Sequence, residues 1–140
     1  MKFLMMVKAN AESEAGVMPD DSLVAEMTKY NEELVKAGAL LDGSGLHPSS
    51  KGARIKFSGG KSTVVEGPFP DPASLIAGYW LIEVESRQKA LEWAKRVPAP
   101  HGKGKEAEIE LRQLFELEDF APSPTIEKAF ELEKRLPGKR

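Results

Sequence analysis

Three polar side chains near the middle of the chain could carry acid–base chemistry: His47, Asp42 and Glu66. An imidazole titrates near neutral pH, and a neighbouring carboxylate can orient it. His47 with Asp42 or Glu66 is therefore a candidate catalytic pair. The alternative is a loop histidine whose ring only hydrogen-bonds to backbone, and the sequence leaves both interpretations open.

Glu66 ends an extended apolar run and precedes the turn Gly67-Pro68-Phe69. Gly67 can take backbone angles that other residues avoid, and Pro68 fixes its own φ and moves Gly67 out of the α region. A strand should therefore end at Glu66. Partial burial would raise the pKa of this carboxyl and mark it as a site residue. Alternatively, Glu66 accepts backbone N–H bonds from its own turn.

A binding pocket around this turn would be lined by one hydroxyl, two turn residues and three aromatic rings: Ser44, Gly67, Pro68, Phe69, Tyr79 and Trp80. Aromatic residues on strands usually belong to the core, which is the competing interpretation. The same residues, however, would also supply the apolar walls and few polar groups that are typical of a ligand site.

No cofactor and no metal site is predicted. The chain has no cysteine, which excludes disulfides, thiolate nucleophiles and cysteine-based metal centres. The two histidines, His47 and His101, do not have the His-x-x-x-His spacing of a metal site. His101 lies in a Pro/Gly/Lys-rich loop, 98–105, where we expect it to be solvated.

The composition is that of one soluble globular domain. The 140 residues are 41% hydrophobic and 30% charged, with a net charge of −2, so no basic stripe favours nucleic acid or an anionic membrane. The first apolar run, 3–7, breaks at Lys8 and is too short for a signal peptide or a membrane span. We expect a cytoplasmic protein without nucleic-acid or membrane partners.

The hydrophobic periods predict two strand–helix–strand units with a hairpin inserted between them. Strands are expected at 3–7, from 39, at 53–57, 61–66, 78–85 and 108–117, and helices at 23–37, from Ser86 to before Pro98, and from Ser123. The loop after Glu66 is expected to join two strands of one sheet. The fold class is α+β, a ferredoxin-like sandwich with an antiparallel sheet and both helices on one face.

Such a sheet leaves its second face uncovered, and the apolar residues on both faces predict a homodimer with two sheets packed face to face. Residues 1–118 are expected to form the domain. Residues 119–140 would be a C-terminal tail with a short helix, because Pro124 suits the first turn of a helix capped by Ser123.

Three segments resemble the YCII-related family, in particular its branch named for an Asp-Gly-Pro-Phe (DGPF) motif: residues 43–48, residues 66–69, and residues 78–84 leading into 90–94. The resemblance covers residues 1 to about 118 and implies a dimeric α/β barrel with mostly no assigned activity. It also implies a His–Asp active site in smaller members and an association of some relatives with sigma factors. Here Glu66 replaces the aspartate, and the first helix holds no histidine, so that pair does not carry over.

Two functions remain open on the sequence alone. The first is binding of a small molecule in a pocket of the homodimeric barrel, with cofactor-free acid–base catalysis as an extension. The second is a non-catalytic dimeric interaction or regulatory module, linked to sigma-factor transcription systems.

Overall fold

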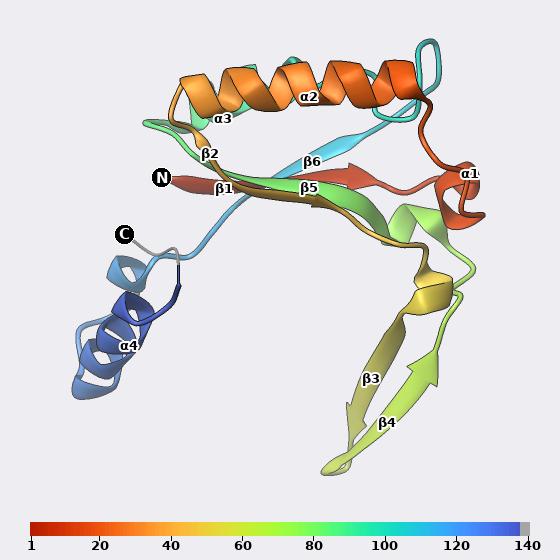
Figure 1. The fold of residues 1–140 in the computed structure, drawn as a ribbon. Helices are drawn as coiled ribbons and strands as arrows, with labels where there is room; N and C mark the ends of the chain where they lie inside the picture. Colours follow the sequence, from red (N-terminus) through yellow and green to blue (C-terminus); the bar gives the residue numbers. More distant parts are fainter. Residues whose placement is uncertain (138–140) are drawn as a thin grey trace.

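The computed structural model describes residues 1–137 and has an α+β architecture with one antiparallel sheet (Figure 1). The sheet has the strand order β2-β5-β1-β6, which is consistent with a ferredoxin-like fold. The elements are β1 (Lys2–Lys8), α1 (Ala11–Glu14), α2 (Asp21–Lys36), β2 (Leu40–Gly45), η1 (Ser49–Lys51), β3 (Ala53–Ser58), β4 (Lys61–Glu66), η2 (Pro72–Ser74), β5 (Ile76–Glu83), α3 (Arg87–Lys95), β6 (Ile109–Gln113), η3 (Leu117–Asp119) and α4 (Pro124–Lys134).

Two helices, α2 and α3, cover the same face of the sheet (Figure 1). Because strand side chains alternate, every second residue of β1 and β5 points to this face. The core consists of these residues and their helical partners: Phe3, Met5, Val7, Trp80 and Ile82 from the strands, and Tyr30, Leu34 and Ala90 from the helices. Strand β5 therefore has one face in the core and one face turned away from the helices.

The helix ends follow local rules that the sequence contains. Asp20, Ser86 and Ser123 each accept a hydrogen bond from the backbone N–H three residues on, which caps α2, α3 and α4. Gly38, with φ +69°, ends α2 in the left-handed conformation that glycine adopts without strain. One helix is absent from the predicted set: residues 11–14 form α1, where Asn10 and Ser13 make a capping box.

The expectation that the turn after Glu66 joins two strands of one sheet is wrong. The predicted hairpin exists, but β3 and β4 form a separate two-stranded sheet that projects from the body (Figure 1). The physical reason is that both hydrogen-bonding edges of β5 are already occupied, one by β1 and the other by β2. Strand β4 therefore has no free edge of β5 to join.

The last strand is shorter than predicted. β6 ends at Gln113, opposite Phe3, because the partner strand β1 begins at Lys2. Phe115, which the alternation places in the same strand, lies beyond it and is 82% exposed. The chain then continues through η3 into α4, on the side of the sheet away from α2 and α3 (Figure 1).

Candidate functional site

A cleft of about 1350 Å³ opens under the N-terminal half of α2, where β1 ends and β5 begins. Three glycines on the helix side of the sheet, Gly43, Gly45 and Gly78, contribute backbone to its floor, and above Gly45 the nearest atom to a Cβ would be the Ala77 carbonyl oxygen at 4.0 Å. Trp80 lies beside this floor, 3.2 Å from where a Cβ on Gly43 would stand. The apolar wall is completed by Val7, Leu23 and Met27.

Asn31 of α2 fixes the indole at the base of the cleft. The Nε1 of Trp80 donates a hydrogen bond of 2.7 Å to its Oδ1, and the ring of Tyr30 meets Trp80 edge-on at 5.5 Å. Because the amide oxygen is used by the indole, the amide nitrogen of Asn31 is left to donate toward the cleft. Sequence analysis missed Asn31, since nothing in the helical period marks its partner.

His101 is held at the cleft wall, and the prediction that it is solvated is wrong. It is half-buried, and its Nε2 lies 2.8 Å from the carbonyl oxygen of Lys8, the last residue of β1. A carbonyl can only accept, so Nε2 must carry the hydrogen, and the lone pair of the neutral ring is on Nδ1. A neutral imidazole with one anchored nitrogen is a suitable base.

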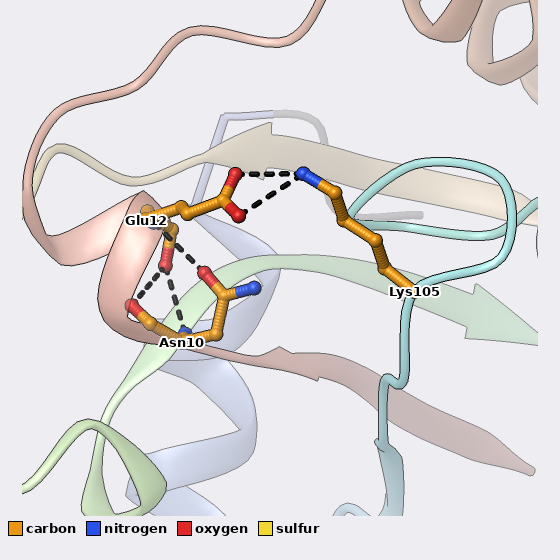
Figure 2. Close-up of polar contacts among 4 residues, drawn as sticks. Asn10, Glu12 and Lys105 are labelled. Atoms are coloured by element: carbon orange, nitrogen blue, oxygen red, sulfur yellow. Dashed lines mark hydrogen bonds and ion pairs between the residues drawn. The ribbon is translucent and has the colours of Figure 1, made fainter.

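An ion pair spans one side of the cleft, between α1 and the loop that carries His101 (Figure 2). Nζ of Lys105 lies 2.8 and 3.1 Å from the two carboxylate oxygens of Glu12. The Asn10–Ser13 capping box holds α1 beneath this pair. The hydrogen bond from Lys105 holds the pKa of the Glu12 carboxyl below its usual range.

Of the three predicted catalytic residues, His47 is the one that lines the cleft. It follows β2, is exposed, and lies between the cleft and a smaller hollow of about 350 Å³ that Phe69 also lines. Asp42 and Glu66 line neither of these two hollows. The structure therefore does not bring His47, Asp42 and Glu66 together around one of them.

Asp42 is instead paired on the sheet face opposite the helices. Its Oδ2 accepts a hydrogen bond of 3.0 Å from the Tyr79 hydroxyl, and its Oδ1 accepts one from the N–H of Gly43. Ser44 is the register partner of Tyr79, so its side chain belongs to the same face. Of the predicted aromatic lining, Trp80 is thus at the cleft base, while the Tyr79 ring points to the other side.

The turn at Gly67 is held by residues that sequence analysis missed. Ser49 donates its hydroxyl and its N–H to the two carboxylate oxygens of Glu14, and its Oγ accepts from the N–H of Phe69 at 2.9 Å. A Cβ on Gly67 would collide with the Ser49 carbonyl oxygen. The guanidinium of Arg54 covers the Phe69 ring at 3.8 Å.

Glu66 and Pro68 are exposed beside this turn. Within residues 1–137 the Glu66 side chain has no hydrogen-bond or ion-pair partner. It is therefore neither half-buried nor bonded to the backbone of its own turn, which are the two environments considered for it from the sequence.

In the same described part of the chain, no group of three or more histidine, aspartate or glutamate side chains is arranged to hold a metal ion. No described helix combines the length and the apolar character needed to cross a membrane.

The family model for the YCII-related domain matches residues 1–115, which include the sheet, helices α2 and α3, the hairpin and the cleft. The chain belongs to the YCII-related family. An uncharacterised protein of Rhizobium meliloti (strain 1021) is 28% identical over 76 residues. That alignment covers 54% of this chain and 61% of the relative, so it spans less than two thirds of the relative's length. In this YCII-related chain, the tail from η3 onward lies outside the family match.

Proposed function

We propose that this YCII-related protein is a homodimer that binds a small molecule in the cleft under α2. The observation that supports this most is the cleft itself, which lies beside Trp80 and Met27 and has open space above Gly45. A ligand site is usually such an apolar concavity with a few fixed polar groups.

The polar groups define the kind of ligand. The Asn31 amide can donate a hydrogen bond, and Nδ1 of His101 can accept one, while the wall around Trp80 and Met27 is apolar. The ligand is therefore a small molecule with a flat apolar part and a polar group that offers both a donor and an acceptor.

Cofactor-free acid–base chemistry is the extension of this proposal. The anchored ring of His101 would take a proton from the ligand at Nδ1 and become an imidazolium, which the Lys8 carbonyl stabilises through Nε2–H. His47, at the edge of the cleft, is the second candidate base or acid. Asp42 and Glu66 would take part only through a surface completed by a second copy.

The uncovered sheet face supports the homodimer. Its centre carries four half-buried residues, Leu4, Met6, Tyr79 and Leu81, opposite one another in β1 and β5. Charged residues of β6, Glu110 and Arg112, lie along one side. An apolar centre beside charged residues is the usual composition of an interface, so a second sheet packed here would complete a dimeric α/β barrel of the DGPF branch.

The cleft can be tested by filling it. Gly45→Leu places a side chain in the cleft, because the nearest atom to a Cβ there is 4.0 Å away. A library of small aromatic acids and amides is screened by NMR, with the Trp80 indole signal as reporter. Compounds should shift this signal in the wild type and in Lys36→Leu, on the exposed end of α2, but not in Gly45→Leu. A library that never moves the signal, or moves it equally in Gly45→Leu, contradicts the proposal.

The second candidate, a non-catalytic interaction or regulatory module linked to transcription, is favoured by a different observation. The projecting hairpin exposes Phe57 and Val64, which a lone binding protein has no need to expose. The same screen separates the candidates, because an interaction module does not require a ligand response in the cleft.

A further inference from the structure

The hairpin β3–β4 is an arm with one apolar face. Ile55, Phe57 and Val64 lie on that face, with Ile55 and Val64 directly opposite each other, and they are 50%, 81% and 61% exposed. A two-stranded sheet is marginally stable in water without a covering layer. Nothing within residues 1–137 covers this face, so a second molecule packed on it would supply the missing layer.

The arm is also basic. Residues 53–66 contain three basic side chains and one acidic side chain. Arg54 and Lys56 alternate with the apolar residues of β3, and Lys61 begins β4. These three basic side chains project to the face opposite Ile55 and Phe57, so a partner that wraps both faces of the arm would combine an apolar contact with negative charge.

The C-terminal tail has this complementary composition. Residues 115–135, from the end of the domain through α4, contain six acidic and three basic residues. The tail exposes Phe115 at 82% and Leu132 at 52%, and the Phe115 ring lies 5.5 Å from that of Phe120. It projects to the same side of the sheet as the arm, but the two stand apart (Figure 1).

We propose that the arm of each copy packs on the tail of the other copy in the homodimer, so that the two chains clasp each other across the open sheet face. The inference rests on the homodimer of the proposed function and adds the contact that holds it. A two-fold axis makes the contact reciprocal, since each copy offers one arm and one tail. A contact between two arms would bring basic residues together, and a contact between two tails would bring acidic residues together. A contact between an arm and a tail pairs opposite charges.

Charge reversal tests the contact. The arm variant carries Lys56→Glu and Lys61→Glu, and the tail variant carries Glu127→Lys and Glu131→Lys. Each alone pairs like charges at both contacts, so its dimer Kd, measured by sedimentation equilibrium, should rise about tenfold or more. An equimolar mixture should return to the wild-type Kd, because both arm–tail contacts of the heterodimer again pair opposite charges.

Two further measurements distinguish a variant that fails to fold from one that only loses the arm–tail contact. At concentrations well below the dimer Kd, the melting temperature of each variant should stay near that of the wild type, because the arm and the tail both lie outside the four-stranded sheet. Phe57→Ser, which removes apolar contact without changing charge, should also raise the dimer Kd.

Four results would overturn the proposal. If the wild type stays monomeric, both the homodimer and the arm–tail contact are refuted. Ligand binding in the cleft is tested separately, by the NMR screen. The wild type could dimerise with a Kd that is the same in both charge variants and in Phe57→Ser. The dimer would then form through the sheet face, and the arm–tail contact would be refuted. Single variants that dimerise as tightly as the wild type, with a tighter mixture, indicate arm–arm contact. If the arm stays uncovered in the dimer and binds a different protein, its apolar face is the binding site for that protein and not for the tail.

Discussion

The indole Nε1 of Trp80 and the amide oxygen of Asn31 are 2.7 Å apart, and this bond joins the central strand β5 to helix α2 at the base of the cleft. The same indole packs edge-on against Tyr30, whose hydroxyl donates to the carbonyl oxygen of Trp93 at 2.7 Å. Core and cleft are thus parts of one hydrogen-bonded aromatic cluster. A substitution in the cleft should therefore change the stability of the core, and a substitution in the core should change the cleft.

Asn31→Leu should destabilise the protein by about 1–3 kcal/mol, because it leaves the buried indole N–H without an acceptor. Urea denaturation followed by tryptophan fluorescence measures this. Asn31→Asp keeps an acceptor of the same shape and is the matched control, which should lose clearly less stability. Equal stability of Asn31→Leu and the wild type would show that the bond contributes nothing.

Gly67→Ala should cost about 2 kcal/mol or more, since its Cβ would collide with the Ser49 carbonyl oxygen and the turn would have to shift. Gly45→Ala is the control, because a Cβ there meets only the Ala77 carbonyl oxygen at 4.0 Å. Thermal unfolding of the two variants should therefore separate them. A Gly67→Ala melting temperature equal to that of Gly45→Ala would contradict the close approach.

Much of the fold could be predicted because its signals are local. The period of α2, the caps Asp20, Ser86 and Ser123, and the Gly59-Gly60 turn each depend on residues within a few positions of one another. The pairing of β4 could not be predicted in this way. It depends on which strands already occupy the edges of β5, and that is decided by the whole sheet.

The site was harder to predict because its contacts join distant parts of the chain. Glu14 meets Ser49 across 35 positions, and His101 meets the Lys8 carbonyl across 93. No spacing rule connects such pairs, so the composition of the 98–105 loop was misleading for His101. His47 could be placed beside a hollow because the glycines next to it in the sequence also form the cleft floor.

Tyr30→Phe should cost about 1 kcal/mol at pH 7 through the lost hydrogen bond to the Trp93 carbonyl. The cost should shrink at alkaline pH. Burial raises the pKa of the Tyr30 phenol above its usual value, so its contribution is complete below about pH 10, the pKa in the unfolded chain, and falls as the pH rises beyond it. Urea denaturation at pH 7 and pH 10.5 measures the change. A constant difference between wild type and variant would contradict the burial argument.

Lys105→Met should return the pKa of the Glu12 carboxyl toward its usual value, because the hydrogen bond from Nζ is the main cause of its depression. A depressed carboxyl contributes when ionised, above its unfolded pKa of about 4.3, and this contribution disappears as the pH falls through the folded value. In the wild type the pair should therefore open only in acid. An NMR titration of the Glu12 side-chain carbonyl carbon follows this directly.

The consequence for the cleft is that the loop carrying His101 should lose protection when the pair opens. The protection factors of the loop amides around Lys105, which are corrected for the pH dependence of intrinsic exchange, should fall in Lys105→Met already at neutral pH, and in the wild type only when the pH falls below the Glu12 pKa. Lys128→Met, on α4 and away from Glu12, is the matched control and should behave as the wild type in both measurements. If Glu12 titrates at the same pH in the wild type and in Lys105→Met, the ion pair does not form in solution. The loop that carries His101 would then be held by the His101–Lys8 hydrogen bond without it.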